Sequence, residues 1–249
     1  MAGHSRWKNI KHRKAASDAK RGKAWSKCVK AIIVAAKNGG QDPSANLSLR
    51  YAIDEARYEN VPRDTIERAI KKGGGELGDD HYEPVRYEAY GPGGAAIVID
   101  ALTNNRTRTA ADVRLILSKF GGNLGTTGCV SHCFEARGLL TIPAGTASED
   151  QLLELAAGAG ADDVATEDDA WVISTAPASL HVVRTALEAS AIKVESARIE
   201  LVPTVTVSTS GEQAQGLLKL LESLEDNDDV QRVYANFDIA ESELDALGA

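Results

Sequence analysis

The chain has 249 residues, of which 43% are hydrophobic and 26% charged, and its formal net charge is −8 at pH 7. This length allows two or three domains, and the composition is ordinary for a soluble globular protein. No apolar run approaches the roughly 20 residues that a membrane span needs. Three cysteines are too few for a disulfide framework, and the N-terminus lacks the apolar region of a secretory signal. We therefore expect a cytoplasmic protein that neither enters a membrane nor depends on disulfides.

Positive charge is concentrated at the start of the chain. Residues 1–37 contain eleven Lys or Arg and one acid, Asp18, for a net charge of +10, so the remaining residues carry −18. A basic segment in an otherwise acidic chain indicates contact with a polyanion, most simply nucleic acid. The alternative is an ordinary solvated helix face, although solubility alone does not require so much positive charge.

The lysines of this segment follow a helical pattern. Lys20, Lys23, Lys27 and Lys30, here called the lysine stripe, are spaced 3, 4 and 3 residues apart, which puts them on one face of an α-helix. The apolar residues of the opposite face are Trp25, Val29, Ile32, Ile33 and Ala36. We expect the helix to bury its apolar face and to present the lysine stripe to solvent.

A second basic feature is the loop 104–108, which joins a predicted strand to a predicted helix. The amides at a helix N-terminus can hold a phosphate there, but it is equally consistent that Asn105 or Thr107 merely caps the helix. The residues expected to contact nucleic acid are Arg6, Lys8, Lys11, His12, Arg13, Lys14, Lys20, Arg21, Lys23, Lys27, Lys30, Arg106 and Arg108.

The fold class predicted from the pattern is multi-domain, combining α and α+β parts. Residues 1–75 form a basic helical domain, with further helices over about 44–59 and 62–72. Residues 134–202 follow the order strand, helix, strand, strand, helix, strand of a ferredoxin-like module, with two short strands on either side of Gly138. This module, within 131–203, is inserted into a second α+β domain made of residues 80–130 and 204–240.

Several chemical sites can be set aside. Cys129, His132 and Cys133 supply three soft ligands but no complete tetrahedral zinc set. The acidic run 225–229 lacks the spacing of a calcium loop and is interpreted as a solvated turn. No arrangement of a nucleophile with a base is recognisable. We predict no catalytic residue, metal, cofactor or small-molecule substrate, and hence not an enzyme.

Five stretches resemble one known family. They are MAGHSRWKNIKHRKAASDAKRGK at the start, NVPRDTIERAIKKG at 60–73, YEAYGPGGAAIVIDALTNNRTRTAADVR at 87–114, FGGNLG at 120–125 and LEDNDDVQRVYANFDI at 224–239. The chain resembles the YebC/PmpR family of bacterial regulators, to which the mitochondrial translational activator of cytochrome c oxidase subunit I also belongs. The segment GCVSHCFEARG at 128–138 departs from the family pattern at His132 or Cys133. The resemblance implies three domains around a cleft, with a helical N-terminal domain and two α+β domains.

Charge and resemblance together predict a non-enzymatic nucleic-acid-binding regulator of gene expression, acting as a DNA-binding transcriptional regulator. The alternative is a translation factor that binds ribosomal RNA or tRNA on the ribosome and relieves stalling. The sequence contains neither an evident helix-turn-helix recognition helix nor an aromatic RNA-binding strand. Recognition through the nucleic-acid backbone and shape is therefore expected, which leaves both alternatives open.

Overall fold

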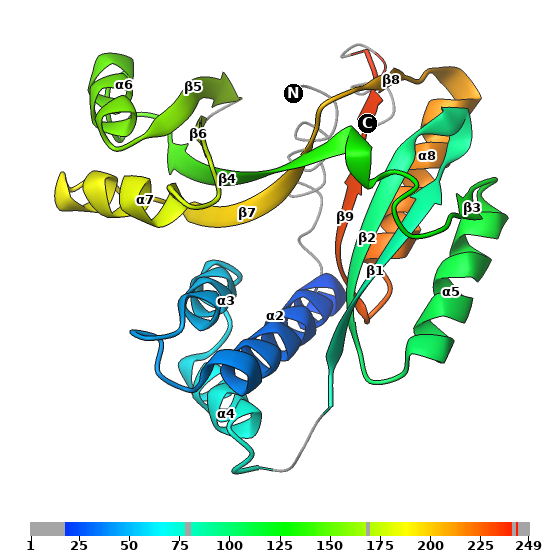
Figure 1. The fold of residues 1–249 in the computed structure, drawn as a ribbon, viewed down its shortest axis with the longest axis horizontal. Helices are drawn as coiled ribbons and strands as arrows, with labels where there is room; N and C mark the ends of the chain where they lie inside the picture. The colour runs from blue at the N-terminus through cyan, green and yellow to red at the C-terminus, as the bar shows by residue number, and fades with distance from the viewer. Residues whose placement is uncertain (1–17, 78–80, 168–169, 241–242, 244–249) are drawn as a thin grey trace. The chain divides into compact units, whose positions relative to one another are not determined.

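A computed structural model describes residues 18–77, 81–167, 170–240 and 243 (Figure 1). The described chain is mixed α and β and divides into two compact units. Residues 135–202 form the smaller unit, and the described residues before and after them form the larger one. The further division of the larger unit into a helical domain and an α+β domain stays a prediction.

The larger unit begins with three helices, α2 (Asp18–Gly39), α3 (Leu47–Tyr58) and α4 (Arg63–Gly73). Helix α2 packs against both of the others. Its buried residues Ile32, Ile33 and Ala36 meet the apolar sides of α3 and α4, and Trp25 and Val29 pack at the edge of this core. The predicted apolar face of α2 is therefore confirmed.

Helix α3 begins later than the predicted start at Ser44. The carboxylate of Asp42 accepts a hydrogen bond from the Ser44 amide at 2.8 Å, which closes a local turn instead of a helix. The helix starts after Asn46, whose side-chain oxygen accepts from the Leu49 amide at 3.0 Å as an N-cap. The same buried side chain donates to the carbonyls of Ala35 and Gly40, both at 2.8 Å, and so ties the end of α2 to the start of α3.

A four-stranded antiparallel sheet follows in the larger unit, with the order β3-β1-β2-β9. Its strands are β1 (Glu83–Tyr90), β2 (Ala96–Thr103), β3 (Asn123–Leu124) and β9 (Val230–Ala235). The short 3-10 turn η1 (Pro92–Gly94) joins β1 to β2, and Gly93 and Gly94 adopt the positive φ angles that this turn requires. The two strands and their glycine turn form a β-hairpin. The short strands β8 (Val207–Ser208) and β10 (Phe237–Asp238) pair in parallel.

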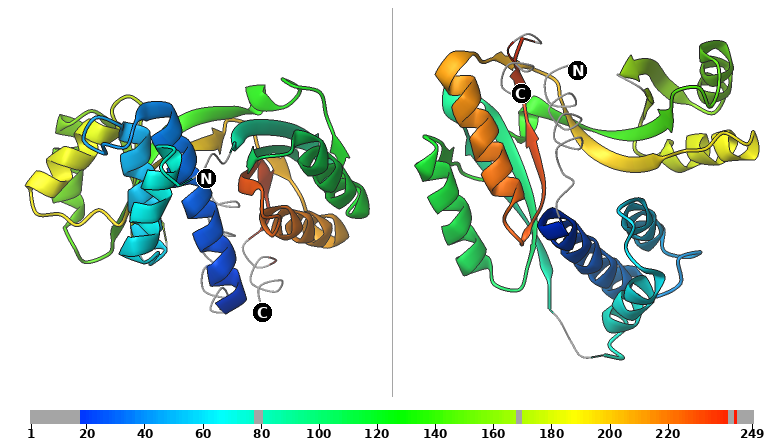
Figure 2. Two further views of the ribbon diagram at one scale, coloured as in Figure 1. Left: turned by 90° about the horizontal axis from the view of Figure 1, so that it is seen from below. Right: turned by 180° about the vertical axis from the view of Figure 1, so that it is seen from behind.

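Two helices cover one face of this sheet, α5 (Arg106–Lys119) and α8 (Gly211–Glu225) (Figure 2). Val113 and Leu117 of α5 and the leucines of α8 form a single core with Ile97 and Ile99 of β2. Elements that precede and follow the smaller unit in the sequence thus form one sheet, because β9 pairs directly with β2.

The smaller unit contains β4 (Phe134–Pro143), α6 (Glu149–Gly158), β5 (Ala161–Glu167), β6 (Ala170–Thr175), α7 (Leu180–Ala189) and β7 (Ser196–Pro203). The 3-10 turn η2 (Ser131–Cys133) precedes β4. The sheet order β5-β6-β4-β7 is that of a split βαβ module, as the element order predicted. Ser148 caps α6 by accepting a hydrogen bond from the Gln151 amide.

The prediction of two short strands around Gly138 was wrong, because β4 runs through this residue without interruption. A Cβ atom at position 138 would lie 2.4 Å from the Thr175 hydroxyl oxygen and 2.9 Å from the Leu180 Cβ atom. Glycine is therefore present because β6 and α7 approach closely, and it does not end the strand.

Candidate nucleic-acid interface and its acidic turn

The segment between α8 and β9 carries four acidic residues, and Glu225–Asp229 is here called the acidic turn. Its backbone is held locally, since Asp226 N–H donates to the Glu222 carbonyl at 2.9 Å and Asp229 N–H donates to the Asn227 side chain at 2.9 Å. The Leu102 amide of β2 donates to the Asp229 carbonyl at 2.8 Å. The last residue of the turn is thus fixed against the end of β2.

Three lysines of the stripe, Lys23, Lys27 and Lys30, contact this acidic turn. The Nζ atom of Lys23 donates to the Asp226 carbonyl at 3.1 Å, and that of Lys27 donates to the Glu225 carbonyl. Lys30 Nζ donates to the Asp228 carbonyl at 2.8 Å and to Asp229 Oδ1 at 2.9 Å. The carbonyls at the C-terminus of a helix lack partners within it and carry partial negative charge. The lysines therefore complement the end of α8 as well as the carboxylates.

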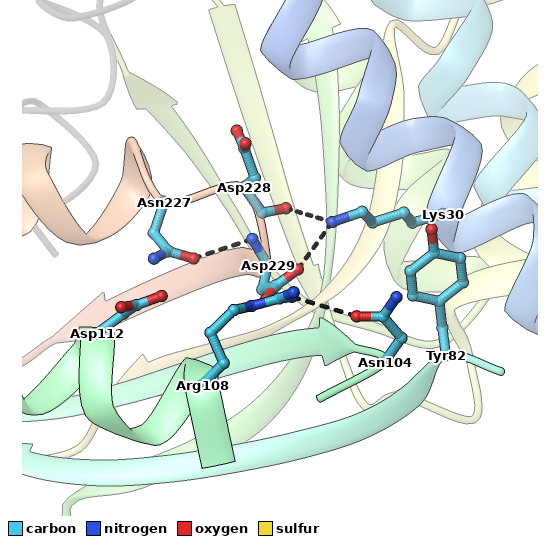
Figure 3. A pocket seen from close by; sticks show the side chains of 8 residues that line it. All are labelled: Lys30, Tyr82, Asn104, Arg108, Asp112, Asn227, Asp228 and Asp229. Carbon is cyan, nitrogen blue, oxygen red and sulfur yellow. Dashed lines mark hydrogen bonds and ion pairs between the residues drawn. The ribbon is translucent and has the colours of Figure 1, made fainter. Parts of the chain in front are cut away.

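Asp229 is the centre of the arrangement (Figure 3). While Oδ1 accepts from Lys30, Oδ2 accepts from Arg108 at 2.7 Å, from the Thr109 hydroxyl at 2.8 Å and from the Thr103 hydroxyl at 3.3 Å. The side chain is only 8% exposed. Burial alone would raise the pKa of Asp229, but the hydrogen bonds from Arg108, Lys30 and Thr109 outweigh it and lower the pKa to about 2. The carboxylate is therefore ionised throughout the neutral range.

A polar cavity of about 320 Å³ lies beside this carboxylate, within the larger unit. Figure 3 shows Lys30 and Arg108 approaching Asp229 from different elements, with Asn104 against Arg108 and Tyr82 near Lys30. The lining residues are Lys30, Tyr82, Asn104, Arg108, Asp112, Asn227, Asp228 and Asp229. Three carboxylates and two cations share this cavity, so an anion entering it must compete with groups that are already paired.

The structure corrects the prediction that the lysine stripe faces solvent for Lys27 and Lys30, and it does not describe the side chain of Lys20. The Lys30 side chain is 13% exposed and Lys27 is half-buried, while Lys23 remains exposed. Helical periodicity correctly grouped these lysines on one face but did not reveal the acidic turn, which lies about 200 residues further along the chain. The run 225–229 is a turn between a helix and a strand, as predicted, and Asp226 and Asp228 are exposed, but Asp229 is buried and not solvated.

The remaining predicted contact residues divide into two groups. Arg6, Lys8, Lys11, His12, Arg13 and Lys14 lie outside the described residues, and Lys20 and Arg21 lie on α2 without described side chains. In the loop 104–108, Asn105 caps α5 by accepting from the Arg108 amide at 3.0 Å, so the capping alternative is observed. Arg106 lies 3.6 Å from Glu83, and Arg108 is paired with Asp229. The structure therefore brings Lys30 and Arg108 together around one carboxylate.

Sequence reasoning missed Glu88 of β1. Its buried carboxylate accepts from the amides of Gly128 and Val130, both at 2.7 Å, and from the Ser131 amide at 2.9 Å. Burial raises the pKa of Glu88, but the three backbone hydrogen bonds outweigh it and leave the pKa below its usual value. A charged residue among the alternating positions of β1 gave no signal of its own, because a strand's outer face normally carries such residues.

The cysteines of the same region are free, and no group of three or more His, Cys, Asp or Glu within the described ranges is arranged to hold a metal ion. Cys129 and Cys133 are half-buried and His132 is exposed. His132 and Cys133 lie in the 3-10 turn η2, and β4 begins directly after it at Phe134.

The structure defines the class of this protein. It is a mixed α and β protein in which the basic helix α2 contacts the acidic turn. Residues 5–76 match the TACO1/YebC protein N-terminal domain, and residues 82–237 match the TACO1/YebC second and third domain. The chain therefore belongs to the TACO1/YebC family, as its sequence motifs indicated.

Relatives of similar length carry regulatory names. A "Probable transcriptional regulatory protein" from Citrifermentans bemidjiense is 51% identical over 99% of this chain and 100% of its own length. One from Sulfurihydrogenibium sp. (strain YO3AOP1) is 52% identical over 99% of each chain. The crystal structure of a conserved hypothetical protein from Aquifex aeolicus is 47% identical, with a TM-score of 0.83 over 90% of this chain and 93% of that one. No helix in the described part of the chain is long and apolar enough to cross a membrane.

Proposed function

We propose that this protein is a non-enzymatic, cytoplasmic regulator of gene expression that acts on transcription by binding DNA. The observation that carries the proposal is the net charge of +10 over residues 1–37 against −18 over the rest of the chain. Such a distribution favours contact with the phosphate backbone. The regulatory names of relatives that match over their full length support the same role.

The contacts of the lysine stripe suggest which basic residues are available to contact DNA first. Lys23, Lys27, Lys30 and Arg108 already donate to the acidic turn. We therefore assign the first contact with DNA to the N-terminal basic residues, and a secondary role to the internally paired ones and to Arg106. The members of the first group are Arg6, Lys8, Lys11, His12, Arg13, Lys14, Lys20 and Arg21.

Salt-dependent binding tests this assignment. We expect the affinity for a fluorescein-labelled DNA duplex, measured by anisotropy, to fall steeply with salt, with a log–log slope of roughly 0.9 for each phosphate contact. Replacing Lys8, Lys11, Arg13 and Lys14 with Gln should reduce that slope by about 3 to 4. The matched control replaces Arg57, Arg63, Arg68 and Lys71, which lie on α3 and α4. Because residues 38–72 contain six basic and six acidic residues, this change should leave the slope unchanged.

A flat salt response, or an equal loss in the control variant, would contradict DNA binding through the N-terminal segment. Crosslinking in growing cells, followed by sequencing of the recovered DNA and RNA, then tests the level of regulation. Promoter DNA that is lost in the N-terminal variant is the expected result. Recovery of ribosomal RNA at one confined site without promoter DNA would overturn the transcriptional proposal in favour of translation.

A further inference from the structure

Two basic features that the sequence places far apart, the lysine stripe and Arg108, meet the same internal anion. We propose that the acidic turn is an internal competitor of nucleic acid, which occupies the donors of Lys23, Lys27, Lys30 and Arg108 until a phosphate backbone displaces it. This inference rests on the proposed nucleic-acid binding and adds a regulation of that binding. In this view the turn sets how tightly the protein binds, since only protein molecules with released donors can use them.

The chemistry of the contact is the first argument. The acidic turn offers the stripe an array of oxygens, namely the main-chain carbonyls of Glu225, Asp226 and Asp228 and the carboxylate of Asp229. A phosphodiester backbone offers the same lysines a similar row of anionic oxygens. The donors around Asp229 are an ammonium, a guanidinium and two hydroxyls, one of them from Thr109 in the first turn of α5. This set is suited to a phosphate as much as to a carboxylate.

Accessibility is the second argument. The ion pair of Lys23 with Asp226 is 3.8 Å long, and its side chains are 45% and 51% exposed. Arg108 is 50% exposed although it is bonded to Asp229. Long lysine and arginine side chains can turn from one anion to another without any movement of the helix that carries them. An approaching polyanion can therefore take over the exposed donors of Lys23 and Arg108 before it reaches Lys30, whose side chain is 13% exposed.

Charge is the third argument. The four acids of the turn match in number the four cations that contact it, Lys23, Lys27, Lys30 and Arg108, so the paired surface has little net positive charge to attract a polyanion. Removing carboxylates from the acidic turn should release the lysines and should also reduce the repulsion of the polyanion. A test must separate these two effects. Asp112 and Asp228 allow this separation, because they line the same cavity but their carboxylates make none of the contacts described above.

The experiment compares two double variants that lose the same charge. Asp226→Asn with Asp229→Asn removes both carboxylates that pair with the stripe, whereas Asp112→Asn with Asp228→Asn removes two neighbouring ones and keeps the Asp228 carbonyl that Lys30 uses. Binding of each full-length variant to labelled duplex DNA and to an RNA duplex of equal length is measured by anisotropy at fixed salt. We expect about tenfold tighter binding in the first variant and about twofold or less in the second.

Folding is followed by circular dichroism melting for every variant. Should the first variant not fold, Asp226→Asn alone removes only a half-exposed pair and should still tighten binding by about threefold. If the wild type binds nucleic acid but folded variants show no gain, weaker binding, or equal gains in both doubles, the competition is rejected and nucleic-acid binding stands. If no variant binds DNA or RNA, the proposed function fails and the competition fails with it.

Discussion

Glu88 and Asp229 illustrate how buried carboxylates act in this protein at the scale of single residues. Each is buried in the folded chain, and each accepts several hydrogen bonds that keep it ionised. The partners differ, since Glu88 accepts from backbone amides of one loop and Asp229 accepts from side chains of three elements. Glu88 therefore orders a segment locally, whereas Asp229 joins distant parts of the chain.

Replacement of Glu88 with Gln tests the local role. The amide group of Gln keeps one acceptor oxygen but turns the other acceptor into a donor that faces backbone N–H groups. We expect the free energy of unfolding to fall by about 2 kcal/mol, as measured by urea denaturation. The control is Glu83→Gln on the same strand, whose half-exposed ion pair with Arg106 should contribute about 0.5 kcal/mol or less. Equal effects of the two changes would contradict the structural role of Glu88.

At the scale of elements, the helices and strands follow local patterns, and their exceptions have tertiary causes. Helix α2 buries the apolar face that its spacing predicts, and the hairpin of β1 and β2 turns at its glycines. Strand β4 instead continues through Gly138, where the local sequence pattern predicted a break between two strands. Gly138 pairs with Thr175 of β6 within the strand, and it is a glycine because Thr175 and Leu180 approach it closely from other elements.

Gly138→Ala tests that explanation. A Cβ atom there would lie too close to Thr175 and Leu180, so we expect the full-length protein to lose about 1–3 kcal/mol of stability in urea denaturation. Gly158→Ala in the same unit is the matched control, because nothing lies within 4 Å of the added Cβ atom and the residue is helical. Alanine favours a helix by up to about 1 kcal/mol over glycine, so this change should be neutral or stabilising. A loss in both variants would indicate that Gly138 has no special packing role.

At the scale of the whole molecule, one carboxylate links parts of the chain that are far apart in sequence. Asp229 joins Lys30 of α2, Thr103 of β2 and the first turn of α5, with up to 199 residues between partners. A second long-range link is the ion pair of Arg232 with Glu55, at 2.7 Å, which joins the sheet to α3. Such links make the stability of the larger unit depend on the ionisation of few groups.

The pH dependence of unfolding follows from Asp229. Its pKa falls from 3.8 to about 2 on folding, so its ionised form stabilises the folded protein above pH 3.8, and this contribution disappears as the pH falls towards 2. After allowance for solvent screening, we expect the wild type to lose about 1–2 kcal/mol more than Asp229→Asn over that range. Urea denaturation at several pH values measures the difference. Asp112→Asn should follow the wild type, and parallel curves for wild type and Asp229→Asn would contradict the assignment.

The sequence by itself determined most elements, apart from the continuity of β4 at Gly138 and the start of α3. It also determined the split βαβ order, the apolar face of α2 and the family, because these depend on local spacing and on continuous motifs. It also predicted Lys30 and Arg108 as contacts to nucleic acid, which stays a prediction. Only the tertiary structure decided what these residues meet. Helical periodicity says which side chains share a face, but the anion opposite that face comes from the acidic turn, 198 to 203 residues away from the lysines that contact it. The burial of Asp229 likewise depends on side chains that folding alone brings together.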